Sequence, residues 1–130
     1  MLKIVSKIIL KLIGWRVDVN LPTEKKFVII GAPHTSNWDL PLALFCFWSV
    51  QTPMTWVGKK QLFVGPLGFI LRLMGGIPVD RSARTGFIEQ IAQQFENHEE
   101  MILSLAPEGT RSKTDVWKTG FYYIALTANV

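Results

Sequence analysis

The spacing of hydrophobic and polar residues predicts helices that alternate with strands. Short apolar runs at residues 27–30, 54–57, 77–79 and 101–105 are typical of strands. Helical periodicity or continuous apolar character marks residues 1–13, 38–50, 59–74, 84–98 and 119–130, of which 59–74 is broken at Gly65-Pro66 and Gly68. Strands alternating with helices favour crossover connections and a mostly parallel sheet. The sequence therefore predicts an α/β fold in a single domain, residues 1–130.

One further strand pair is expected near the N-terminus. Residues 15–21 alternate between apolar and polar side chains, and residues 22–26 form a polar stretch that contains Pro22. The strand at 27–30 follows directly. This order predicts an antiparallel N-terminal pair of strands.

Residues 1–13 predict an amphipathic helix with two open interpretations. Lys3, Lys7 and Lys11 are four apart and fall within an arc of about 80°. The opposite face is apolar and carries Leu2, Val5, Ile9, Leu12 and Ile13. Such a helix either lies in a membrane surface, as an interfacial segment over residues 1–14, or packs on its own domain with a solvated lysine edge. It is too short to span a bilayer, and it lacks the pattern of a signal peptide.

Composition and charge narrow the class of protein. Hydrophobic residues make up 48% of the chain and charged residues only 18%, which argues against disorder and predicts an apolar neighbour. The net charge of +4 is local, because Lys3, Lys7, Lys11 and Arg16 precede every acidic residue. A nucleic-acid partner is not expected from such a distribution. The single cysteine, Cys46, lies in an apolar helical stretch and is a poor nucleophile there.

A histidine and an aspartate follow the strand at 27–30. His34 can accept a proton near neutral pH, and a carboxylate on its other ring nitrogen would fix its tautomer. Residues five apart on a helix diverge by about 140°, so His34 and Asp39 can pair only if His34 precedes the helix and Asp39 lies in its first turn. The alternative is structural, because Ser36 followed by Asp39 resembles a capping box.

Two other loops follow strands and carry charged residues. Asp80 and Arg81 come after the strand at 77–79, and residues 108–111 come after the strand at 101–105. Loops after parallel strands lie along one sheet edge, so we expect them to share a cleft with His34. Gly109 permits close backbone approach, Arg111 suits phosphate or carboxylate, and Glu108 is a candidate partner for either arginine.

Three segments together resemble a known family. Residues 34–39 (HTSNWD), 76–81 (GIPVDR) and 107–112 (PEGTRS) are similar to successive motifs of the glycerol-3-phosphate and lysophosphatidic acid acyltransferase family, in the same order. Residues 117–121 (WKTGF) resemble the basic and aromatic segment that follows the third motif. The resemblance covers roughly residues 25 to 125. The chain ends before the family's fourth, proline-containing motif, so the C-terminal part of the family domain is expected to be missing.

The resemblance implies transfer of an acyl group from an acyl-coenzyme A or acyl-carrier-protein thioester to the hydroxyl of a lysophospholipid-like acceptor. It implies that His34 is the general base and that Asp39 orients it. The residues implied in acceptor binding are Arg81, Glu108, Gly109, Thr110, Arg111 and Lys118. Neither a metal nor a bound cofactor is implied. The expected location is peripheral, on the cytoplasmic face of a membrane, with residues 1–13 at the surface and acyl-carrier protein as a further partner.

Two other functions remain open on the sequence. A truncated domain that keeps the groove and the interfacial helix would be an inactive lipid-binding module. A metal-dependent hydrolase would use His34, Asp39, Asp80 and Glu108, but it needs His98 as a second histidine ligand. His98 lies in the polar segment 96–100, where a solvated helix end is the simplest interpretation.

Overall fold

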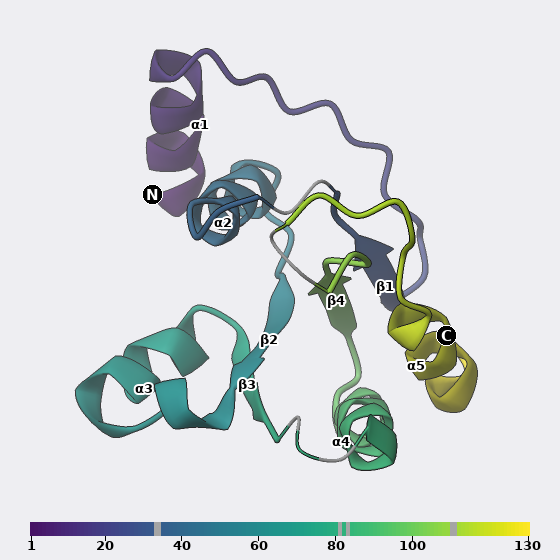
Figure 1. Ribbon diagram of the computed structural model, residues 1–130. Helices are drawn as coiled ribbons and strands as arrows, with labels where there is room; N and C mark the ends of the chain where they lie inside the picture. The colour runs from purple at the N-terminus through teal and green to yellow at the C-terminus, as the bar shows by residue number, and fades with distance from the viewer. Residues whose placement is uncertain (33–34, 81, 83, 110–111) are drawn as a thin grey trace.

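The computed structural model describes residues 1–32, 35–80, 82, 84–109 and 112–130, and within them the chain forms an α/β fold (Figure 1). The elements in chain order are α1 (Leu2–Leu12), β1 (Lys26–Ile30), α2 (Asp39–Ser49), β2 (Thr55–Lys59), the 3₁₀ helix η1 (Lys60–Leu62), α3 (Gly65–Leu73), β3 (Gly76–Val79), α4 (Arg84–Asn97), β4 (Met101–Leu105) and α5 (Gly120–Ala128). The predicted α/β class is confirmed.

The four strands found in the described ranges form one sheet in the order β1-β4-β2-β3. Every pair is parallel: Val28 lies opposite Leu103, and Trp56 lies opposite both Ser104 and Gly76. β4 is the last strand in the chain, yet it lies between the first two. Because all strands run the same way, the loops that follow them share one edge of the sheet.

The predicted antiparallel strand pair at the N-terminus is wrong. Residues 15–21 form no strand, and β1 pairs with β4 in parallel instead. The alternating apolar side chains do not reach a core: Trp15 and Val19 are about half exposed. Figure 1 shows this segment as a long connection between α1 and β1.

Each face of the sheet has its own apolar core. α4 and α5 cover one face, where the fully buried side chains of Ile91, Phe95, Leu103 and Ile124 meet. On the other face, Leu44 of α2 and Phe63, which follows η1, pack with Trp56 of β2. The rings of Trp56 and Phe63 are 5.8 Å apart. Helices on both faces explain why the strands are apolar runs with little alternation.

α1 packs on α2 through a narrow face only. Ser6 and Leu10 are buried there, and the Lys3 ammonium donates to Gln51 Oε1 at 2.9 Å. The opposite side of α1 is exposed and apolar, with Ile8 at 54% and Leu12 at 80%. None of the helices in the described part of the chain is both long and apolar enough to cross a membrane.

The apolar stretch 59–74 divides as predicted at Gly65-Pro66, where α3 begins with Pro66 in its first turn. The predicted break at Gly68 is wrong, because Gly68 lies inside α3. A Cβ at Gly68 would lie 2.2 Å from the backbone carbon of Phe63. The glycine therefore permits the helix to contact the preceding turn, rather than ending the helix.

Candidate active site

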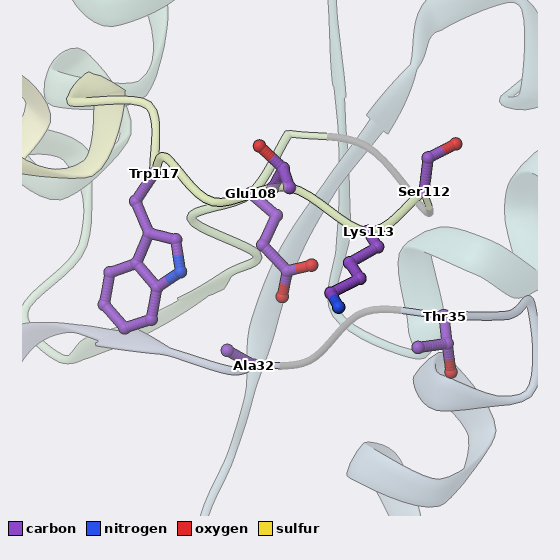
Figure 2. A pocket seen from close by; sticks show the side chains of 7 residues that line it. Ala32, Thr35, Glu108, Ser112, Lys113 and Trp117 are labelled. Carbon is purple, nitrogen blue, oxygen red and sulfur yellow. The ribbon is translucent and has the colours of Figure 1, made fainter.

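The loops that follow β1 and β4 line a depression of about 550 Å³ at the carboxyl edge of the sheet. β1 and β4 are neighbours, and the Gly31 N–H donates to Leu105 O at 2.8 Å where both strands end. The lining residues are Ala32, Thr35, Glu108, Ser112, Lys113, Thr114 and Trp117. Figure 2 shows the Glu108 side chain between Trp117 on one side and Lys113 on the other. This depression has a carboxylate, an ammonium group and an indole ring on its walls.

Asp39 is the first residue of α2, as the pairing argument required. Its Oδ2 accepts the Thr35 N–H at 2.7 Å and the Ser36 N–H at 3.0 Å. The second of these bonds is the one that the acid of a capping box makes, but the predicted box is incomplete, because the N-cap of α2 is Trp38 and not Ser36. The Ser36 hydroxyl instead accepts the Trp38 N–H at 3.2 Å. Asp39 thereby fixes the backbone between the end of β1 and the start of α2.

Glu108 lies on the opposite wall and is 8% exposed. The loop that carries it folds back on itself: the Lys118 N–H donates to Pro107 O at 2.8 Å, and the Gly109 N–H donates to Ala106 O at 3.3 Å. A buried carboxylate on a loop held at both ends keeps a fixed position relative to the depression. Glu108 is therefore a buried carboxylate in the wall of the depression.

Gly109 and Lys118, both predicted to bind the acceptor, contact each other. Gly109 has φ +65°, a left-handed conformation that glycine adopts without strain. A Cβ at this position would lie 2.7 Å from Lys118 Cδ, so the lysine stem crosses directly over the glycine. Lys118 is exposed and is not among the residues that line the depression.

The loop after β3 lies against a separate, smaller depression of about 260 Å³, lined by Lys59, Gln61, Val79, Asp80 and Ser82. Asp80 Oδ1 accepts the Ser82 N–H at 2.9 Å. Hydrogen bonds from Ser82, with a smaller contribution from the Lys60 charge, hold the pKa of Asp80 below its ordinary value. Because β2 separates β3 from β4, the described residues near position 81 do not reach the first depression.

Four of the predicted site residues, His34, Arg81, Thr110 and Arg111, lie outside the described residues. Asp39, Glu108, Gly109 and Lys118 are described, and of these Glu108 lines the depression.

The sequence predicted no binding role for Lys113, Trp117 or Thr35, which do line it, although Thr35 and Trp117 lie in segments that resemble the family's motifs. Their positions in the loops after β1 and β4 were the available signal. The order of the strands, which makes these two loops neighbours, could not be read from the sequence.

The metal-site hypothesis gains no support from geometry. Within the ranges that the structure describes, no three His, Cys, Asp or Glu side chains are grouped so that they could hold a metal ion. His98 lies at the end of α4, and its Nδ1 is 2.7 Å from Gln94 O. His98 is thus on the helix end that the sequence indicated.

A parallel α/β domain with a depression that carries charged side chains where β1 and β4 end is the setting in which such folds place enzyme sites. Comparison with known families then identifies the chain: a family model described as Acyltransferase matches residues 16–130. The protein belongs to this family, which is the glycerol-3-phosphate and lysophosphatidic acid acyltransferase family that its motifs resemble. No curated protein and no solved structure matches the chain.

Proposed function

We propose that this acyltransferase moves a fatty acyl group from an acyl-coenzyme A or acyl-carrier-protein thioester to the hydroxyl of a lysophospholipid-like acceptor at a membrane surface. The family match over residues 16–130 is the observation that carries this proposal. The family match supports acyl transfer in general, and the motifs and surfaces of this chain support the choice of donor and acceptor.

In the proposed reaction, His34 takes the proton of the acceptor hydroxyl. The oxygen then attacks the thioester carbonyl carbon, and the new ester forms as the carbon–sulfur bond breaks. The leaving thiolate receives the proton from the imidazolium, so the histidine returns to its starting state. Neither a metal nor a covalent enzyme intermediate is required by this sequence of bond changes.

The position of Asp39 supports its assignment as the partner of His34. Its Oδ2 holds the N–H of Thr35, the residue that directly follows His34 in the chain. A carboxylate accepts about four hydrogen bonds, so two backbone donors are compatible with an imidazole donor on the same group. An acid in this position both shapes the loop and stabilises an imidazolium next to it.

The depression supports the binding of a polar head next to an apolar chain. Lys113 brings positive charge to it and Trp117 brings an apolar ring. We assign acceptor binding to the loop after β4, with Glu108, Gly109, Thr110, Arg111 and Lys118 as the sequence indicated and Lys113 in addition. Arg81 keeps the role in binding the acceptor that the motif resemblance implies, and its guanidinium suits a phosphate.

The exposed apolar side of α1 supports attachment to the membrane. Ile4, Ile8 and Leu12 point away from α2 and are all more than half exposed, while Lys7 and Lys11 are exposed beside them. A helix with this arrangement lies in the plane of a bilayer surface with its lysines at the headgroups. The proposed location is therefore peripheral, and the cytoplasmic face is the side that the family resemblance implies.

The proposal predicts that His34→Ala lowers the rate of acyl transfer by roughly 10²- to 10⁴-fold, the contribution of a general base. The assay measures release of free coenzyme A from an acyl-coenzyme A with lysophosphatidic acid present. His98→Ala is the matched control, because His98 is the only other histidine and is exposed at the end of α4.

The control variant should keep the wild-type rate. Equal rates for wild type and His34→Ala would contradict the mechanism. Lipid binding without any turnover by the wild type would point instead to a binding module.

A further inference from the structure

α3 is a helix with almost no partner in the protein. Gly68 is its only buried residue, and Leu71 is half-buried against the core on the α2 side of the sheet. The remaining residues of the helix are exposed, and all of them except Arg72 are uncharged. An apolar helix of this kind normally has a covering layer.

The exposed side chains of α3 form one apolar face. At 100° per residue, Phe69, Ile70 and Leu73 point away from the side that Gly68 and Leu71 turn toward the protein. Phe69 is 63% exposed and Leu73 is 73% exposed. The segment that leads into the helix adds Leu62 at 50% and Val64 at 72%. Exposed apolar side chains are therefore present both in the segment 62–64 and along α3.

The charge around this surface is mainly positive among the described residues, and Asp80, which lies near Lys60, is the one acid described there. Between Asp39 and Asp80 the sequence has no acidic residue, and its three basic residues are Lys59, Lys60 and Arg72. All three are exposed. The Arg72 guanidinium lies 5.5 Å from the centre of the Phe63 ring and donates a hydrogen bond to Phe63 O. These contacts hold the Arg72 side chain, from the last turn of α3, against Phe63. Exposed apolar side chains flanked by basic residues suit a membrane surface, where the apolar groups enter the hydrocarbon and the cations meet anionic headgroups.

We propose that α3, with the segment 62–64, inserts its apolar face into an anionic bilayer and is a second membrane contact beside α1. α1 and α3 both lie on the side of the molecule away from α5 and β1, so one plane can touch both (Figure 1). A second copy of the chain fits less well, because a symmetric dimer through α3 would bring two sets of Lys59, Lys60 and Arg72 together. The proposal concerns attachment and requires no particular reaction.

The test is sedimentation with vesicles of phosphatidylcholine and phosphatidylglycerol in equal parts, and with vesicles of phosphatidylcholine alone. The variant is Phe69→Gln with Leu73→Gln, two exposed side chains one helical turn apart. The matched control is Tyr122→Gln with Leu126→Gln, an aromatic residue and a leucine at the same spacing on α5, exposed at 56% and 61%.

We expect the α3 variant to bind the anionic vesicles at least about tenfold more weakly than the wild type, since two apolar side chains lose lipid contact. The α5 variant should bind within twofold of the wild type. Lys60→Gln should weaken binding to anionic vesicles and leave binding to neutral vesicles unchanged. Thermal unfolding of each variant shows whether the fold is retained.

Equal vesicle binding by the wild type and a folded α3 variant overturns the proposal. So does a wild-type dimer, seen by light scattering, that the α3 variant disrupts while vesicle binding persists, because a second copy would then cover the helix. Acyl transfer is measured separately in detergent micelles. Loss of turnover there with normal vesicle binding counts against the proposed function only.

Discussion

Gly109→Ala is the substitution for which the structure predicts the most specific result. Gly109 has φ +65°, and an alanine Cβ would lie 2.7 Å from Lys118 Cδ and 3.1 Å from Lys118 Cε. A left-handed conformation costs an L-residue about 1–2 kcal/mol, and the loss of freedom in the unfolded chain returns about 0.4–1 kcal/mol. Displacing the lysine stem from its rotamer adds about 0.5–1.5 kcal/mol. The free energy of unfolding should fall by about 2 kcal/mol.

The chain provides a control for each contribution. Gly14 has φ +77° with no atom within 4 Å of its added Cβ, so Gly14→Ala measures the conformational cost without a clash. We expect it to lower the free energy of unfolding by about 1 kcal/mol. In a Lys118→Ala background, Gly109→Ala should cost only that amount, because the crossing side chain is gone.

The assay is urea unfolding at 25 °C, followed by circular dichroism with linear extrapolation. Gly109→Ala with wild-type stability would contradict the left-handed conformation. A cost that is the same with and without the Lys118 side chain would contradict the contact between the two residues. Gly109 also lies between Glu108 and the rest of the proposed acceptor loop, so acyl transfer should fall by more than the loss of stability explains.

Two further predictions concern the interior. Leu103→Ala, in the fully buried centre of β4, should lower the free energy of unfolding by about 3 kcal/mol. Leu126→Ala, at a position 61% exposed, should lower it by less than about 1 kcal/mol. Similar losses for the two variants in urea unfolding would contradict the assignment of the core. Burial raises the pKa of the Cys46 thiol. Its alkylation by iodoacetamide at neutral pH, followed by mass spectrometry, should therefore be slower than that of free cysteine and should accelerate only at higher pH. Modification faster than that of free cysteine would contradict this environment.

The sequence was sufficient to predict structure where the pattern depends on residues close together in the chain. Apolar runs such as residues 101–105 marked all four strands, and the 140° argument placed Asp39 in the first turn of α2. Both depend on the geometry of a few consecutive residues. The same local reasoning failed at residues 15–21, where alternation was present but the strand that would have paired with it, β1, pairs with β4 instead.

Strand order and surfaces without partners could not be derived in this way. Nothing in the sequence of β4 indicates that it inserts between β1 and β2, and this insertion is what brings Lys113 and Trp117 to the loop after β1. The sequence likewise predicted an apolar helical stretch at residues 59–74, without indicating which of its side chains are buried. The three-dimensional arrangement was needed to show that Phe69 and Leu73 have no protein neighbour that buries them.

The place of β4 in the sheet also governs when the site can form. β1 and β4 are separated in the chain by α2, β2, α3, β3 and α4, so their pairing is among the contacts of longest sequence separation in the molecule. Contacts of this kind form slowly, because a large loop must close before they give any stabilisation. During synthesis, the segment that contains Thr35 and Asp39 is made before the segment that contains Glu108. The site therefore requires the pairing of β4 with β1, and a chain in which these two strands are unpaired lacks it.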